Sequence, residues 1–260
     1  MTLPALENWE STRTGLQRAA QALGAVCAAL RPPQPKHLHL SLYPVRRGLS
    51  TGPLPVGGEL LLDFAARAVF YARPAIPHFE IPVHGFSQES LAARIVRAFE
   101  HAGHTLELDQ QKVADTEPLA IDAGLAAGYA AALDTIHTAA ARFRGRLYGP
   151  QTPLVVWPHG FDLSTLWFTR AGSDESSDPH MAFGFSPGSA GFARPYLYVY
   201  GWPTPSDLGR VTLPPLARVH TDGWTGVVVD YDALVGLDSP VDVIENLYGD
   251  IHRALQPLMA

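Results

Sequence analysis

The chain has 260 residues, a formal net charge of -6, 47% hydrophobic residues and 17% charged residues. This balance excludes extensive disorder, which needs low hydrophobicity and high charge. Without a dense stripe of Lys and Arg, nucleic acid is not expected as a partner. No apolar run approaches the roughly 20 residues that span a bilayer, so a membrane is not expected either. The single Cys27 cannot form an internal disulfide, and the N-terminus lacks a signal-peptide pattern, which together indicate a cytoplasmic protein.

The first half of the chain predicts two helices with strands between them. Apolar residues at helical spacing predict a helix from Trp9 that ends at Pro32-Pro33. Leucines alternate with polar residues over 36–43, which is typical of a half-buried strand. Two further strands, 59–64 and 67–72, are close enough to form a hairpin. Ser87 is the expected N-cap of the second helix, which Gly103 can close.

The second half predicts a similar order of elements. A long Ala-rich helix is expected over 120–147, and a final helix follows Ser239 as its N-cap. Between them we expect strands at 154–157, 163–169, 180–185, 195–202 and 224–230. Because the strands follow one another at hairpin spacings, the predicted fold class is α+β, with antiparallel sheet packed on helices. We expect a single domain over 1–260, with 1–110 and 118–260 as candidate diverged copies of one helix–strands–helix unit.

Three segments of the sequence stand out as a set. They are Leu-Pro-Ala-Leu-Glu-Asn-Trp at 3–9 with Thr12 and Thr14, His-Leu-His-Leu-Ser-Leu-Tyr at 37–43 followed by Arg-Gly-Leu-Ser-Thr at 47–51, and Trp-Pro-His-Gly-Phe-Asp-Leu at 157–163 followed by Phe-Gly-Phe-Ser-Pro-Gly at 183–188. In order and spacing the chain resembles a largely bacterial family known only as domain of unknown function 5996. The resemblance covers nearly the whole chain. It implies a single domain and no particular reaction.

His37 and His39 are the sharpest hint of a metal site. Two positions apart on a strand, their imidazoles would lie on one side, about 6 to 7 Å from each other. A third ligand would come from His159, Asp162 or His180. The alternative is a pair of polar residues on the solvent side of an edge strand. Since there is no HExxH motif and no cysteine ligand set, we predict no tightly bound metal and no cofactor.

His159 and Asp162 follow the rigid Trp157-Pro158 pair and precede a strand, so a fixed turn is expected to place them. In a catalytic interpretation, His159 is a general acid or base and Asp162 orients its ring. In the alternative, Asp162 accepts hydrogen bonds from backbone amides in an Asx-turn. Trp157 is a candidate ligand-binding residue beside them. The absence of a Gly-x-Ser-x-Gly motif disfavours acyl-enzyme chemistry.

Alternation over the strand at 195–202 places several aromatic side chains on one face: Tyr196, Tyr198, Tyr200 and Trp202. This face could bind a flat ligand, with Tyr198 and Tyr200 as contacts, or it could be the packed side of the sheet.

A second candidate for ligand binding is Arg47. It lies with Arg46 in an expected hairpin loop that also contains Ser50 and Thr51. Guanidinium groups and backbone amides both suit a carboxylate or a phosphate. A solvated turn is the alternative interpretation.

These residues support one leading functional hypothesis and two alternatives. The leading hypothesis is a pocket for a small molecule, lined by His37 and His39, the His159–Asp162 turn, and Tyr198 with Tyr200. In the first alternative the aromatic face binds another protein or a second copy of the chain. In the second, a metal at the histidines makes the protein a hydrolase or an oxygenase.

Overall fold

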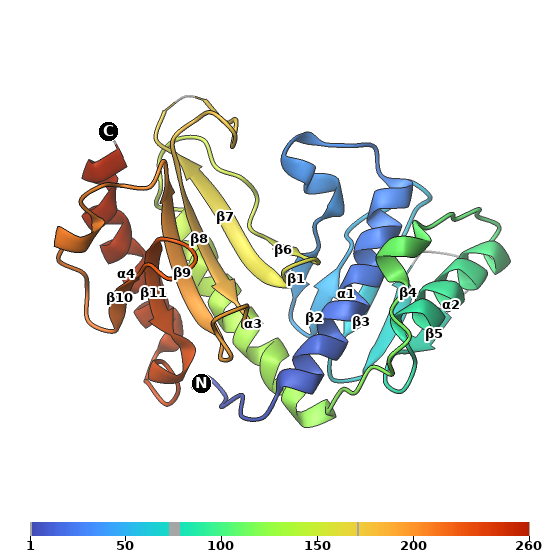
Figure 1. Cartoon of the computed structure of the whole chain (residues 1–260). Coiled ribbons are helices and arrows are strands. Elements are labelled where there is room, and N and C mark those ends of the chain that lie inside the picture. The colour runs from blue at the N-terminus through green and yellow to red at the C-terminus, as the bar shows by residue number, and fades with distance from the viewer. Residues whose placement is uncertain (1, 73–78, 171, 260) are drawn as a thin grey trace. The chain divides into compact units, whose positions relative to one another are not determined.

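The computed structural model describes residues 2–72, 79–170 and 172–259 (Figure 1). The chain divides into two compact units. The N-terminal unit consists of Leu6–Asp134 and Val156–Phe161. The C-terminal unit consists of Met1–Ala5, Thr135–Val155 and Asp162–Ala260. The proposed single domain and the proposed duplication stay predictions, and each unit is described below by itself.

The N-terminal unit contains an antiparallel sheet, two whole α-helices and the part of a third helix, α3 (Ala123–Arg144), that precedes Thr135. Its elements are α1 (Glu10–Leu30), η1 (Pro35–Leu40), β1 (Tyr43–Val45), β2 (Gly48–Ser50), β3 (Glu59–Asp63), β4 (Ala68–Ala72), β5 (Phe79–Pro82), α2 (Gln88–His101) and η2 (Gln110–Val113). The strands lie side by side in chain order, β1-β2-β3-β4-β5. Here η denotes a 3₁₀-helix. The expected hairpin of β3 and β4 is confirmed by the pairing of Glu59 with Ala72.

One face of this sheet forms the core of the unit. Leu60, Leu62, Val69 and Tyr71 are buried and alternate with half-exposed neighbours along β3 and β4. Both α1 and α2 contact the sheet and each other (Figure 1). The side chain of Ser87 accepts a hydrogen bond from the Ser90 amide, which confirms the predicted N-cap of α2.

The strand expected over 36–43 is wrong for most of its length. Residues Pro35–Leu40 form a 3₁₀-helix instead, and Lys36 and His37 have left-handed φ values of 56° and 54°. In the β1–β2 hairpin Tyr43 pairs with Ser50, the last residue of β2. Before Tyr43, Leu42 forms an isolated antiparallel bridge with Val156. In the described part of the chain, residues 35–40 have no such strand neighbour, and a strand there would leave its backbone groups unpaired.

The C-terminal unit is built on a second antiparallel sheet. Its elements are the residues of α3 (Ala123–Arg144) from Thr135 onward, β6 (Val155–Trp157) at its boundary, β7 (Asp162–Phe168), β8 (His180–Ser186), β9 (Tyr196–Trp202), η3 (Leu208–Arg210), β10 (Ala217–His220), β11 (Gly226–Asp230), η4 (Tyr231–Ala233), α4 (Pro240–Leu255) and η5 (Gln256–Met259). The strand order is β10-β11-β9-β8-β7-β6. With both sheets antiparallel and packed on helices, the predicted α+β class is confirmed.

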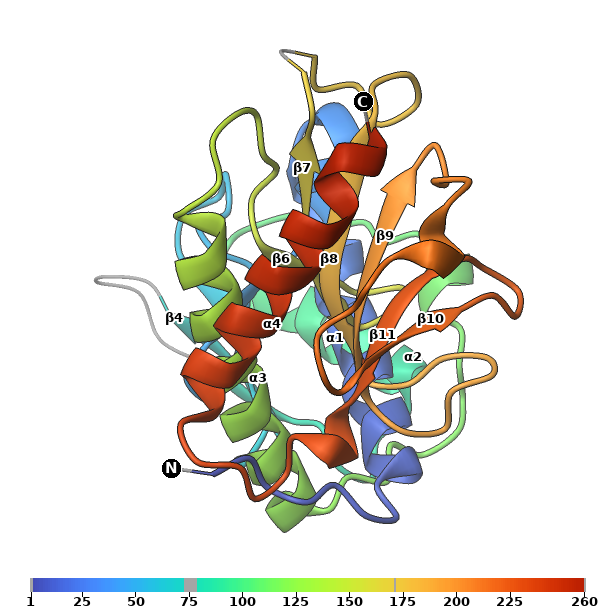
Figure 2. The same cartoon turned by 90° about the vertical axis from the view of Figure 1, so that its left-hand side faces the viewer.

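Helices α3 and α4 lie on the same face of this second sheet (Figure 2). The ring of Phe143 on α3 lies 4.7 Å from that of Phe183 on β8 and 5.6 Å from that of Tyr248 on α4. The hydroxyl of Tyr248 donates a hydrogen bond of 2.8 Å to the carbonyl of Gly184. The opposite face of the sheet carries the aromatic side chains of β9. Among the described residues, no helix is long and apolar enough to cross a membrane.

Candidate functional site

A stripe of small and polar residues runs along one side of α1. Gln17, Gln21, Gly24 and Ala28 follow one another at spacings of four, three and four, which place them on one helix face. Ala25 lies beside this stripe. Gly24, Ala25 and Ala28 have much smaller side chains than the leucines on the core side of the helix, so this part of the helix leaves room for another group.

The turn after β6 packs against the stripe. Gln17 Nε2 donates a hydrogen bond of 2.7 Å to the carbonyl of His159. A Cβ atom at Gly24 would lie 2.8 Å from Cγ of Pro158, so the absence of a side chain at Gly24 allows the turn to approach the helix. At the end of the turn, Phe161 is fully buried, with its ring 5.4 Å from that of Tyr129. The turn is therefore held at both ends.

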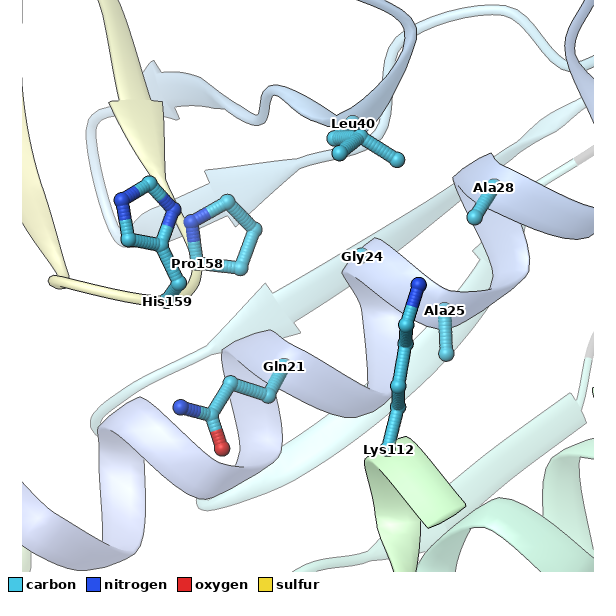
Figure 3. Close-up of a pocket in the computed structure, with 8 residues that line it drawn as sticks. All are labelled: Gln21, Gly24, Ala25, Ala28, Leu40, Lys112, Pro158 and His159. Atoms are coloured by element: carbon cyan, nitrogen blue, oxygen red, sulfur yellow. The ribbon is translucent and has the colours of Figure 1, made fainter. Parts of the chain in front are cut away.

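Between α1 and this turn lies a pocket of about 460 Å³, here called the α1 pocket (Figure 3). It is lined by Gln21, Gly24, Ala25, Ala28, Leu40, Lys112, Pro158 and His159. All of these residues belong to the N-terminal unit. The volume lies within the 300–1,000 Å³ range of ligand pockets.

Three polar side chains border the largely apolar α1 pocket: Gln21, Lys112 and His159 (Figure 3). Gln21 Oε1 accepts a hydrogen bond of 3.0 Å from Gln88 Nε2, so α2 helps to fix the Gln21 amide. Lys112 Nζ lies 3.8 Å from Asp109 Oδ2. Since both side chains are mostly exposed, this ion pair is weak and leaves the ammonium able to bind another anion.

This arrangement provides an apolar surface with a cation at its edge. The pocket walls can bury a hydrocarbon or aromatic group, while Lys112 can pair with a carboxylate or a phosphate. The imidazole of His159 can donate or accept a hydrogen bond. Of the predicted site residues, His159 thus lines the α1 pocket. The Trp157 ring lies beside the His159 ring, with 6.4 Å between the two ring centroids.

His37 and His39 lie in η1 and not on a strand, but their ring centroids are 6.2 Å apart. The Nδ1 atom of His39 accepts a hydrogen bond of 3.2 Å from the amide of Gln34, which leaves Nε2 as its other polar atom. Within the described ranges, no three His, Cys, Asp or Glu side chains gather into a group that could hold a metal ion. The expectation of no bound metal and no cofactor stays a prediction.

Arg47 lies in the turn between β1 and β2, so a hairpin forms here as predicted. Ser50 and Thr51 do not lie in its turn, because Ser50 is the last residue of β2. Its Nε atom lies 2.8 Å from Asp63 Oδ2, and 68% of its side chain is exposed. Part of the Arg47 charge is therefore already balanced by a carboxylate. Anion binding at this residue stays a prediction.

In the C-terminal unit, two predicted site residues are brought together. The Tyr198 hydroxyl donates a hydrogen bond of 2.5 Å to Asp162 Oδ2. Tyr198 is on β9 and Asp162 on β7, so the tyrosine ring extends across β8 between them. It crosses at Gly184, where a Cβ atom would lie 2.2 Å from Cζ of Tyr198. The predicted pairing of Asp162 with His159 stays a prediction, since the two residues belong to different units.

The aromatic side chains of β9 lie on one face, as the alternation predicts. The ring centroids of Tyr198 and Tyr200 are 6.2 Å apart and nearly parallel, and the Trp224 ring meets both of them edge-on. Burial, followed by the nearby Asp162 charge, raises the pKa of Tyr198 well above its usual value. Burial raises the pKa of Tyr200 to about 12, with smaller contributions from Glu175 and Asp162. Both hydroxyls therefore stay protonated at neutral pH.

The sequence did not identify Gln21, Gly24 or Lys112 as site residues. The signal that could have found the first two is the polar and small stripe on α1, which interrupts the apolar pattern at helical spacing. Lys112 carries no such signal, because η2 reaches α1 only through the tertiary fold. Each of these residues lines the α1 pocket.

The model of a family described as Family of unknown function (DUF5996) matches residues 2–256 of the chain. No curated protein and no solved structure matches the chain. The family match covers every residue of the α1 pocket.

Proposed function

The chain belongs to the DUF5996 family, whose function is unknown, and we propose that it binds a small molecule with an apolar body and one anionic group in the α1 pocket. The observation that carries this proposal is the position of Lys112 at the edge of a pocket of about 460 Å³ with largely apolar walls.

The size and lining of the pocket support a small ligand. Gly24, Ala25 and Ala28 form a floor of small side chains, and Leu40 and Pro158 supply apolar walls. Each buried methylene group of a ligand gains about 0.8 kcal/mol, so a chain of six to eight carbons is enough for measurable affinity.

The charge of the pocket supports an anionic group on that ligand. Lys112 is its only charged lining residue among those described, apart from the titratable His159. A ligand that carried an amine would instead meet a like charge. Gln21 and His159 add hydrogen-bonding groups for orientation.

Titration calorimetry with octanoate, octanol and octylamine tests the proposal. The three probes share one chain length and differ in charge. We expect octanoate to bind best and octylamine worst. Lys112→Gln should weaken octanoate binding by up to about fivefold, since an exposed ion pair contributes up to about 1 kcal/mol. Arg97→Gln, which removes an exposed charge from α2, is the matched control and should have no effect.

A second variant tests the place of binding. Ala28 and Ala29 are both exposed on α1, but only Ala28 is among the residues that line the pocket. Ala28→Leu should abolish octanoate binding, and Ala29→Leu should leave it unchanged. Equal effects of the two substitutions, or equal affinity for octanoate and octylamine, would contradict the proposal.

Association through the aromatic face of β9 is a second candidate, because Trp202 is a large apolar side chain that is 38% exposed. Sedimentation over a range of concentrations tests it: a monomer at all concentrations would rule out self-association. A cytoplasmic location and the absence of a nucleic-acid partner stay proposals that rest on composition.

A further inference from the structure

The N-terminal unit contains a second pocket, of about 430 Å³, whose lining shares no residue with that of the α1 pocket. Its lining includes Arg31, Leu38, Tyr43, Ser50 and Glu59. In contrast to the α1 pocket, it is lined by both a cationic side chain, Arg31, and an anionic one, Glu59. This pocket is called the Arg31 pocket below.

Arg31 is held in place by backbone carbonyl groups. Its Nη1 atom donates to the carbonyls of His39 and Ser41, at 3.3 Å each, and Nη2 donates to the carbonyl of Thr51. These acceptors come from two segments, 39–41 and Thr51, so the guanidinium is held on two sides before any ligand arrives. A fixed arginine loses little conformational entropy when it binds a carboxylate.

Glu59 carries the opposite charge to Arg31, and its side chain is also held in place. Its Oε2 atom accepts a hydrogen bond of 2.5 Å from Ser50 Oγ, and Ser50 Oγ in turn accepts one of 2.7 Å from the amide of Gly52. The carboxylate is half-buried at the start of β3. Backbone and side-chain hydrogen bonds thus hold it within the pocket lining.

The two charges do not neutralise each other. In the described part of the chain, neither Arg31 nor Glu59 forms an ion pair within 4.0 Å, although both line the same pocket. An anion alone would be attracted by Arg31 and repelled by Glu59, and the reverse holds for a cation. A molecule that carries both charges a short distance apart avoids both penalties.

The remaining walls suit an apolar side chain. Tyr43 is 42% exposed, and its ring packs on Gly52, where a Cβ atom would lie 3.0 Å from Cε2 of the ring. Gly52 has a φ of 67°, which favours glycine. The ring and Leu38 offer apolar surface beside the charges, and an aromatic face also attracts an ammonium group.

From this arrangement we propose that the Arg31 pocket binds a zwitterionic α-amino acid with an apolar side chain. Arg31 pairs with its carboxylate and Glu59 with its ammonium group. The proposal is independent of the proposed function, which concerns the α1 pocket and a ligand without an amine.

Titration calorimetry with three probes tests the requirement for both charges. The probes are L-phenylalanine, 3-phenylpropanoate, which lacks the amine, and phenethylamine, which lacks the carboxylate. We expect L-phenylalanine to bind at least about tenfold more tightly than either analogue, because each analogue leaves one charge unpaired. Equal affinity for L-phenylalanine and 3-phenylpropanoate, or no binding of L-phenylalanine at millimolar concentration, would overturn the proposal.

Two substitutions test the roles of the residues. Glu59→Gln keeps an acceptor for Ser50 and removes only the charge. It should weaken L-phenylalanine by about tenfold and strengthen 3-phenylpropanoate, a reversal that misfolding cannot produce. Arg31→Lys keeps the charge but loses the planar fork, and should weaken both carboxylate probes. Glu80→Gln, an exposed carboxylate on β5, is the control and should change nothing.

The same variants separate the two pockets. Ala28→Leu should leave L-phenylalanine binding unchanged, and Glu59→Gln should leave octanoate binding unchanged. If Glu80→Gln reduced L-phenylalanine binding as much as Glu59→Gln does, the ligand would not occupy the Arg31 pocket, and this inference would be wrong whatever the outcome for octanoate.

Discussion

The hydroxyl of Tyr198 lies 2.5 Å from Oδ2 of Asp162, although a whole strand separates the two residues in the sheet. The ring spans that strand because Gly184 has no side chain to obstruct it. The short distance and the ionised acceptor are typical of strong, charge-assisted hydrogen bonds.

Replacing Tyr198 by Phe should lower the free energy of unfolding by about 1–3 kcal/mol, because the Asp162 carboxylate loses a donor in a partly buried place. Urea denaturation measures this change. Tyr200→Phe is the matched control, since no hydrogen bond of the Tyr200 hydroxyl is found among the described residues, and it should cost less than about 0.5 kcal/mol. Equal losses for both variants would show that the bond to Asp162 contributes little.

Alanine substitutions at two helical glycines should have opposite effects. At Gly249 on α4, the nearest atom to an added Cβ is Arg253 Nη1 at 3.9 Å, so Gly249→Ala should stabilise the protein by about 0.5–1 kcal/mol through helix propensity. At Gly24 the added Cβ would lie 2.8 Å from Pro158, and overpacking of this kind costs about 1–3 kcal/mol. Gly24→Ala should therefore be destabilising. Thermal unfolding of the two variants compares them directly, and a stabilising Gly24→Ala would mean that the turn moves away freely.

The thiol of Cys27 makes stability depend on alkaline pH. Burial raises its pKa from 9.0 to about 11, against a smaller lowering by the Arg31 charge. Between these values the unfolded chain loses the thiol proton while the folded chain keeps it, so unfolding becomes easier as pH rises. The expected loss is about 1.4 kcal/mol per pH unit over this window, and none below pH 9.

The comparison of wild type with Cys27→Ala isolates this effect from the titration of the tyrosines. The difference in unfolding free energy between the two proteins should be constant below pH 9 and should shrink between pH 9 and 11. In the folded wild type at pH 8, the thiol should react with iodoacetamide only after denaturant is added. A constant difference across the alkaline range would contradict burial of the thiol.

Elemental analysis tests the expected absence of metal. Protein purified without chelator should contain well under one equivalent of zinc, iron or manganese. If near-stoichiometric metal were found and were lost in the His37→Ala, His39→Ala double variant, the prediction would be wrong and η1 would become a metal site. Each single variant should then lose the metal as well, because a two-histidine site needs both residues.

The elements with long, regular patterns could be predicted from the sequence. The helix after Trp9, the Ser87 cap, and the strands around Tyr198 were identified by their spacing alone. The segment at 36–43 was not, because its alternation is the pattern of a strand, whereas a 3₁₀-helix has three residues per turn. Alternation also gives no sign of the left-handed backbone at Lys36 and His37 in η1. The sequence also predicted His159, Asp162 and Tyr198 as site residues. Their neighbours in the structure could not be predicted in the same way. Lys112 beside His159 and Gly184 beside Tyr198 come from other segments of the chain, and a local sequence pattern does not show which segments meet.

Each of the two units is built from more than one segment of the chain, and this limits which fragments of the protein can contain a whole unit. The chain passes from one unit to the other after Ala5, Asp134, Val155 and Phe161. A fragment that ends at Asp134 contains both sheet and helices of the N-terminal unit but lacks Pro158 and His159. Its α1 stripe would then lose the cover of the turn. A protein fragment that ends at this boundary would therefore lack part of the α1 pocket lining, even if its remaining residues fold.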